Sequence, residues 1–311
     1  MLDKYTRKWV EKKSRTQRQR SLNALRRFAE WLHDTYGIGP SALVVKATRG
    51  GRGPEKVERV LREYCRFLTD KRGQKEGSAI QWYSVLRGFF TANKANLGRY
   101  PNFGVQSGPD ETTALTQDRV KRMVKSCDNP LDRFLIAFFE QSGQRIGVLT
   151  AMKRNMIVRG ASGHGIVKVP EQFQDPQGEN VNTFERRYTF IVGRDTMQLL
   201  HELDKWLSDK HSSYEGGWLF DLSKRTMGRI IDNAAQAVHI QEKEHTKTRR
   251  WLSAIHPNAF REYYKESMMK AGSNPRCFMH MLGLRVPSTL GNREPTDEEL
   301  LEAYIQAEPM L

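Results

Sequence analysis

Apolar residues recur at helical spacing through the first hundred positions of this chain, and basic residues stand between them. In residues 16–33, the spacing of Leu22, Leu25 and Leu32 places them on one face of an amphipathic helix. Two more helices of this kind are predicted, one over residues 55–71 and one from Ser78 through Phe90. The pattern therefore predicts an all-helical first domain over residues 1–103.

The positive charge of the chain is concentrated in the same helical part. Residues 1–105 hold 23 Lys and Arg against 9 Asp and Glu, whereas the rest of the chain holds 28 against 27. Nearly all of the net charge of +15 is therefore carried by the first third. Such asymmetry indicates a polyanionic partner, of which nucleic acid is the commonest. The alternative is a solvated basic face that keeps the protein soluble.

The helical spacing of apolar residues stops after this domain, and the sequence beyond it contains both helix and strand patterns. Residues 104–115 are predicted to be a linker, because Pro, Gly and Thr accumulate there. A second domain over residues 116–311 is expected to combine helices with two strands around an Asp-Pro-Gln-Gly segment. The strands are predicted at residues 166–170 and 187–192, and the helices from Thr116 and at residues 131–142, 195–209, 224–238, 258–271 and 297–307. The expected fold class is mainly α with a small β-hairpin or sheet.

Length and composition narrow the class of protein further. A chain of 311 residues with 38% hydrophobic residues is long enough for two folded domains. No apolar run approaches the roughly 20 residues of a membrane-spanning helix, and the first residues lack the apolar stretch of a signal peptide. Cys65, Cys127 and Cys277 are too far apart for a metal site and are expected to be reduced. We therefore expect a cytoplasmic protein without a metal centre.

Three residues far apart in the sequence have side chains suited to phosphate chemistry. Arg145 lies in Gln-Ser-Gly-Gln-Arg-Ile-Gly-Val-Leu, Arg261 in His-Pro-Asn-Ala-Phe-Arg-Glu-Tyr-Tyr, and Tyr304 in Glu-Ala-Tyr-Ile-Gln-Ala. An arginine donates two parallel hydrogen bonds to phosphate oxygens and stays charged at any working pH. A tyrosine hydroxyl can attack phosphorus and preserve the bond energy in a covalent ester. Together, the three fit the cleavage and rejoining of a phosphodiester.

The order and spacing of these motifs resemble the tyrosine recombinase, or integrase, family, and most of all the integrases of archaeal viruses and plasmids. The resemblance implies a helical core-binding domain followed by a mixed α catalytic domain. It implies that Arg145 and Arg261 bind the scissile phosphate of double-stranded DNA and that Tyr304 forms a 3′-phosphotyrosyl intermediate. It also implies a site-specific recombinase of a mobile element that needs no metal, ATP or other cofactor. By the same resemblance, the active unit is a homo-tetramer on two DNA sites, associated with the nucleoid.

The other catalytic positions of that family match this chain less well. Val148 stands where the family has a carboxylate after the first arginine, and Leu284 where it has a late His or Trp. Asn258 stands where a His is usual, and His256 lies two residues upstream, so both are candidates. Lys168 is the candidate for the hairpin lysine that acts as general acid in the family.

Several alternatives are open. The rival candidates are Arg186 and Arg187 for the general acid, His280 for the late histidine, and Tyr263 and Tyr264 for the nucleophile. Arginine is a poor proton donor near neutral pH, and both rival tyrosines share a helix with Arg261. For the whole protein, one alternative is a type IB topoisomerase-like enzyme with the same chemistry. The other is a DNA-binding protein that has lost catalysis, which the departures at Val148, Asn258 and Leu284 favour.

Overall fold

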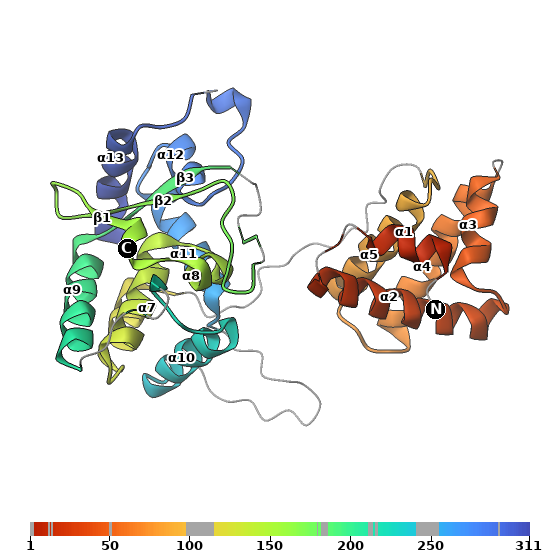
Figure 1. The fold of residues 1–311 in the computed structure, drawn as a ribbon, viewed down its shortest axis with the longest axis horizontal. Helices are drawn as coiled ribbons and strands as arrows, with labels where there is room; N and C mark the ends of the chain where they lie inside the picture. The colour runs from red at the N-terminus through yellow and green to blue at the C-terminus, as the bar shows by residue number, and fades with distance from the viewer. Residues whose placement is uncertain are drawn as a thin grey trace. The chain divides into compact units, whose positions relative to one another are not determined.

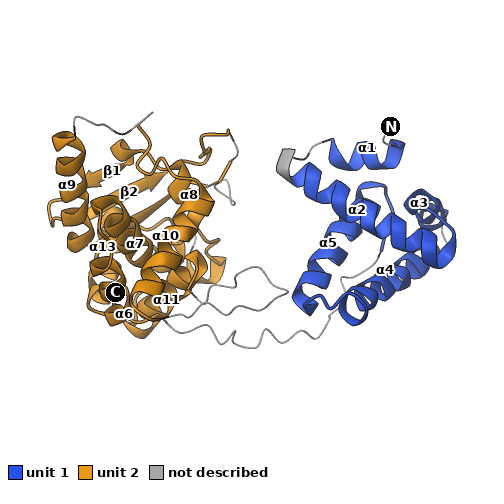
Figure 2. Ribbon diagram, turned by 90° about the horizontal axis from the view of Figure 1, so that it is seen from below, with its two compact units in different colours: residues 1–108 blue, residues 109–311 orange. Residues whose placement is uncertain are grey.

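The structure is a computed structural model that describes residues 3–11, 13, 15–49, 52–97, 115–178, 180–181, 186–210, 214, 217–240, 255–291 and 293–311. The chain divides into two units, residues 1–108 and 109–311 (Figure 2). The predicted linker over residues 104–115 lies outside the described residues except for Leu115. Each unit buries an apolar cluster of its own.

Helices alone form the described part of the first unit. They are α1 (Lys4–Val10), α2 (Arg15–Tyr36), α3 (Pro40–Thr48), α4 (Gly53–Asp70) and α5 (Glu76–Ala92) (Figure 1). The apolar faces predicted from helical spacing are buried: Phe28 and Leu32 of α2, Leu61 of α4 and Phe89 of α5 have no exposed surface. Four arginines of α2 are exposed: Arg18, Arg20, Arg26 and Arg27.

A three-stranded antiparallel sheet with helices around it forms the second unit. The strands are β1 (Ile157–Arg159), β2 (Gly165–Val169) and β3 (Tyr188–Val192), with β2 in the middle. The helices are α6 (Gln117–Lys125), α7 (Pro130–Ser142), α8 (Ile146–Ala151), α9 (Arg194–Asp209), α10 (Lys224–Ala237), α11 (Pro257–Lys270), α12 (Pro275–Met281) and α13 (Asp297–Ala307), with 3-10 turns η1 (Arg154–Met156), η3 (Ser288–Leu290) and η4 (Glu308–Met310) (Figure 1). The expected fold class, mainly α with a small sheet, is confirmed.

Helix α7 is the central element of the second unit. It packs against α6, α9, α11 and β3, and every residue from Phe134 to Ser142 is buried. A helix that is buried on all sides is typical of the middle of a domain, where no face meets water. Among the residues that the structure describes, no helix is both long and apolar enough to cross a membrane.

Short elements account for most differences between prediction and structure. The sequence pattern predicts none of α1, α3, α8, α12 and β1, the longest of which, α3, has 9 residues. Such elements contain too few turns or alternations for a period to be recognised. Helix α3 begins with Pro40 in its first turn, a position that favours proline. Pro40 therefore lies after the end of α2 and at the start of α3.

Candidate active site

A tight turn after α7 leads directly to the first predicted arginine. Helix α7 ends at Ser142 and is capped by Gly143, whose φ of 58° lies in the left-handed region that favours glycine. A Cβ at this position would lie 2.7 Å from the ring of Tyr264 and 2.9 Å from the side chain of Leu282. Glycine is therefore required by both conformation and space. Arg145 follows two residues later as the N-cap of α8.

Arg261 reaches the same turn from α11. Its Nη1 donates to the Gly143 carbonyl at 2.8 Å, and its Nη2 donates to the Leu282 carbonyl at 2.8 Å. The residue is only 9% exposed. Among the described residues, the two carbonyls use two of the five N–H donors of the guanidinium, which leaves three for an oxyanion. These contacts fix the guanidinium without neutralising its charge.

The two guanidiniums act on each other electrostatically. Burial lowers the pKa of Arg261 to about 10, and the positive charge of Arg145 acts in the same direction. Arg261 nevertheless remains charged near neutral pH. A bound anion would offset both the repulsion between the two cations and the cost of burying one of them. The arginine pair, Arg145 and Arg261, is therefore suited to hold a phosphate.

Gln144 and Tyr188 connect the arginine pair to the sheet. The hydroxyl of Tyr188, on β3, donates to Gln144 Oε1 at 3.1 Å. The Nε2 atom of Gln144 donates to the carbonyls of Ser142 at 3.0 Å and Met281 at 2.8 Å. Burial raises the pKa of Tyr188, and the charges of both arginines act against that rise. The phenol of Tyr188 is thus coupled to the whole arginine pair.

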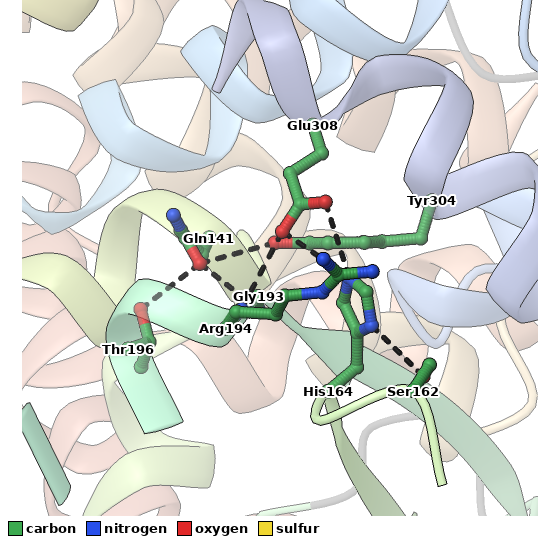
Figure 3. Close-up of polar contacts among 8 residues, drawn as sticks. All are labelled: Gln141, Ser162, His164, Gly193, Arg194, Thr196, Tyr304 and Glu308. Carbon is green, nitrogen blue, oxygen red and sulfur yellow. Dashed lines mark hydrogen bonds and ion pairs between the residues drawn. The ribbon is translucent and has the colours of Figure 1, made fainter. Parts of the chain in front are cut away.

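Tyr304 lies in the core and faces a different group. Its hydroxyl donates to Gln141 Oε1 at 3.2 Å, and the same oxygen accepts from Gly193 N at 2.9 Å and Thr196 Oγ1 at 3.0 Å (Figure 3). Burial, followed by repulsion from a neighbouring tyrosine and carboxylates, raises the pKa of Tyr304 well above its usual value. The arginine pair is not among the groups that shift this pKa most. Arg145 and Arg261 therefore act on each other through their charges, whereas the Tyr304 hydroxyl is hydrogen-bonded to Gln141.

A second polar cluster holds the segment that follows Tyr304. Glu308, in η4, accepts from His164 Nε2 at 3.1 Å and from the backbone N–H of Arg194 at 3.4 Å (Figure 3). The other ring nitrogen of His164 lies 2.9 Å from Ser162 Oγ. The buried imidazole also meets the ring of Tyr304 edge-on, with ring centroids 6.0 Å apart. These contacts stabilise the end of α13 and keep Tyr304 against the core.

Glu140, next to Gln141 on α7, is a buried carboxyl group without full hydrogen bonding. It is 5% exposed, and its Oε1 has no hydrogen-bond partner among the described residues. Burial raises its pKa from 4.5 to about 8, with Lys121 acting in the opposite direction. The group is therefore largely protonated at neutral pH in the folded protein.

Glu140 makes folding stability fall as the pH rises from about 4.5 to about 8. Within this window the folded state binds a proton that the unfolded state has released, so a rise in pH favours unfolding. We expect Glu140→Gln to remove a pH-dependent loss on the order of several kcal/mol. Urea unfolding at pH 5 and pH 9 measures it, with the exposed Glu202→Gln as control. Equal pH dependence in Glu140→Gln and the unchanged protein would contradict this assignment.

The remaining candidates occupy separate places. Lys168, on β2, is exposed, and its Nζ forms an ion pair with Asp297 at 2.8 Å. His256 is the N-cap of α11, and Asn258 is exposed in the first turn of that helix. Val148 is buried in α8. Among the described residues, no group of three or more His, Cys, Asp and Glu could hold a metal ion.

Several residues around the site are absent from the sequence-based prediction. Gln141 and Gln144 are polar residues at the end of a strongly apolar segment, which is a signal of buried hydrogen bonding. His164 is flanked by Gly163 and Gly165, which is a weaker signal of close packing. Tyr188 carries no comparable signal, because a tyrosine is common in any strand.

Comparison with solved structures identifies the fold as that of the tyrosine recombinases and integrases. One similar structure is the Tn1549 transposon integrase in complex with transposon right end DNA, with a TM-score of 0.58, 13% identity, and coverage of 98% of this chain and 99% of that chain. Another is the XerH site-specific recombinase bound to palindromic difH substrate, a post-cleavage complex, with a TM-score of 0.53, 12% identity, and coverage of 96% and 92%. No protein-family model and no curated protein matches the chain.

Proposed function

We propose that this protein is a site-specific DNA recombinase that cleaves and rejoins double-stranded DNA through a 3′-phosphotyrosyl intermediate. The observation that carries the proposal is the arginine pair, in which Arg261 is fixed by two carbonyls beside the charge of Arg145. Two guanidiniums can bind the non-bridging oxygens of one phosphate and stabilise the charge that develops on them during attack. The fold shared with a recombinase and an integrase supports the proposal.

In the proposed reaction, Tyr304 Oη attacks the scissile phosphorus and passes its proton to water, and the bond from phosphorus to the 5′ oxygen breaks. A general acid, for which Lys168 is the candidate, gives the leaving 5′ oxygen its proton. The 5′ hydroxyl of a partner strand then attacks the phosphotyrosine and gives its proton to the deprotonated general acid, and the bond from phosphorus to Tyr304 Oη breaks, after which Tyr304 takes up a proton from water. Neither step consumes ATP or needs a metal. Because Tyr304 faces Gln141 in this structure, its hydroxyl has to leave that partner before it attacks.

The rest of the molecule is assigned roles by the same proposal. The first unit, with nearly all of the net positive charge, contacts the DNA backbone, so binding weakens steeply as salt rises. The second unit is the catalytic domain. The active assembly is a homo-tetramer that holds two DNA sites, and it acts in the cytoplasm with the nucleoid.

Covalent capture on a random library tests the function and finds the target sequence in the same experiment. Nicked duplexes with a random central sequence are incubated with the protein and denatured in detergent, and DNA attached to protein is recovered and sequenced. We expect an enriched sequence that, as a defined duplex, forms an adduct and exchanges strands with a second copy. Adducts with no sequence preference, together with relaxation of supercoiled plasmid, would indicate a topoisomerase-like enzyme. Enriched binding without any adduct would indicate a DNA-binding protein that has lost catalysis.

Tyr188→Phe is expected to slow adduct formation about tenfold. The change removes the hydrogen bond to Gln144, and misplacing the Gly143 turn shifts both guanidiniums relative to the phosphate. Tyr264→Phe is the matched control, because Tyr264 is also buried near Arg261 but its hydroxyl, among the described residues, donates to Met281 Sδ alone, at 3.6 Å. Single-turnover rates on the captured duplex measure the effect. Equal rates for the two variants would show that the Tyr188 hydroxyl does not position the arginine pair.

A further inference from the structure

A pocket lies beside the arginine pair, between the start of β3 and the end of α12. It is lined by Arg186, Arg187, Tyr188, His280, Gly283, Leu284 and Val286. Tyr188 is a wall of this pocket, and its hydroxyl donates to Gln144, the residue directly before Arg145. The pocket therefore borders the proposed site of cleavage.

The opposite wall of the pocket is also connected to the arginine pair, through a backbone contact. Leu282, whose carbonyl accepts from Arg261, directly precedes Gly283. Gly283 has a φ of 59°, and a Cβ there would lie 3.0 Å from the ring of Tyr188. The turn is thus packed closely against Tyr188, so the pocket and the arginine pair keep a fixed relation.

His280 presents one hydrogen-bond donor. Its Nε2 lies 3.1 Å from the backbone N of Thr189 and accepts from it. Because a backbone N–H can only donate, Nε2 carries no proton, and the neutral imidazole holds its proton on Nδ1. Among the residues that the structure describes, Nδ1–H has no hydrogen-bond partner, so it is the part of the ring that can bind a ligand in the pocket.

The charges around the pocket are mostly positive. Arg186 and Arg187 are exposed at its edge. The carboxylates that act on His280 are Glu294 and Asp297, and Asp297 is paired with Lys168 at 2.8 Å. Two arginines and an imidazole N–H together match the oxygens of a phosphate, which accept hydrogen bonds and carry negative charge.

We propose that this pocket is a second phosphate subsite, which binds a backbone phosphate of the same DNA strand whose scissile phosphate lies at Arg145 and Arg261. Arg186 and Arg187 supply charge, and His280 Nδ1–H supplies a hydrogen bond. This subsite rests on the proposed function for the identity of its ligand as DNA. It fixes the register of the strand, so that one particular phosphate faces the nucleophile.

The salt dependence of DNA binding tests the subsite without any catalysis. The probe is a fluorescent duplex of arbitrary sequence, with affinity measured by anisotropy over a series of salt concentrations. We expect Arg186→Ala with Arg187→Ala to weaken binding about tenfold and to reduce the salt slope by about 1 to 2. The control, Arg159→Ala with Arg194→Ala, removes the same charge from exposed positions of the same unit. Equal losses in both double variants would overturn the proposal, because they would reflect net charge alone.

His280→Gln tests the contribution of the imidazole. The Oε1 atom of a glutamine can still accept from the Thr189 N–H, but its NH2 donor lies at the end of the side chain and not at the ring position of Nδ1, so the fold is kept while the donor is displaced. We expect affinity for the same duplex to fall a few-fold with an unchanged melting temperature. Affinity equal to that of the unchanged protein would remove His280 from the subsite.

A methylphosphonate scan of the captured duplex locates the phosphate. Each uncharged linkage near the cleavage site is tested with the unchanged protein and with the double variant of Arg186 and Arg187. We expect one linkage, distinct from the scissile one, whose neutralisation weakens the unchanged protein but not the double variant. Additive losses at every linkage would overturn the subsite. If covalent capture yields no site, the recombinase proposal fails, while the salt series still decides whether the pocket binds phosphate.

Discussion

Tyr304→Phe is expected to form no covalent adduct with the captured duplex, while its DNA affinity stays within about twofold of the unchanged protein. The change removes only the hydroxyl that attacks phosphorus in the proposed reaction. The Oε1 atom of Gln141 still accepts hydrogen bonds from Gly193 N and Thr196 Oγ1. The loss of one hydrogen bond is therefore expected to cost only about 1 kcal/mol of folding stability. Denaturing gels measure the adduct, and urea unfolding measures the stability.

The rival tyrosines supply the controls for this result. Tyr263→Phe is the closest, because Tyr263 lies on α11 and its hydroxyl also donates to a single acceptor, the carbonyl of Met310, at 2.6 Å. This variant should retain the adduct. An adduct in Tyr304→Phe would mean that another tyrosine attacks, and loss of the adduct in Tyr263→Phe alone would identify it. Peptide mapping of the phosphotyrosine on the unchanged protein names the residue directly.

The buried position of Tyr304 adds a condition to the proposed mechanism. A phenol that donates to Gln141 with a raised pKa is a weak nucleophile. Attack therefore requires both a new position and a new proton acceptor. The contacts that hold the end of α13, above all those of Glu308 with His164 and with the Arg194 N–H, have to be broken or rearranged for that movement.

The sequence predicts the long elements of the fold, and its assignment of two arginines to the site stays a prediction. Apolar spacing is strong where a helix has several turns, as in α2 and α7, and the capping box of α13 at Thr296 and Glu299 is present in the structure. Arg145 and Arg261 can be recognised because each lies in a motif of several residues. Whether the two arginine side chains lie close together depends on the backbone turn at Gly143, which the spacing of apolar residues does not predict.

The position of Tyr304 could not be predicted from the sequence. Leu300, Ala303, Tyr304 and Ala307 form an apolar stripe on α13, so periodicity fits a packing tyrosine and a nucleophile on a movable helix equally well. The choice depends on the partner of its hydroxyl, and Gln141 lies 163 residues away in the chain. The pairing of Gln144 with Tyr188 is likewise a long-range contact, at 44 residues. Contacts of this kind are set by tertiary packing, which local patterns do not encode.

Gly143→Ala is expected to lower the stability of the second unit by on the order of 3 kcal/mol and to slow adduct formation about a hundredfold. The left-handed φ of 58° accounts for part of the cost. The rest comes from the new Cβ, which meets the ring of Tyr264 at 2.7 Å and the side chain of Leu282 at 2.9 Å. Relief of this overlap has to move the Gly143 carbonyl that holds Arg261. One methyl group therefore disturbs the arginine pair.

Gly178→Ala separates the effect of backbone strain from the effect of steric overlap. Gly178 lies in the same unit with a φ of 77°, and a Cβ there would meet nothing within 4 Å. This control carries the conformational strain without the overlap, so it should lose about 1 kcal/mol of stability and keep its rate of adduct formation. Urea unfolding and single-turnover cleavage, measured below the unfolding transition, compare the two variants. Equal behaviour would mean that strain alone matters at Gly143, and that the turn does not position Arg261.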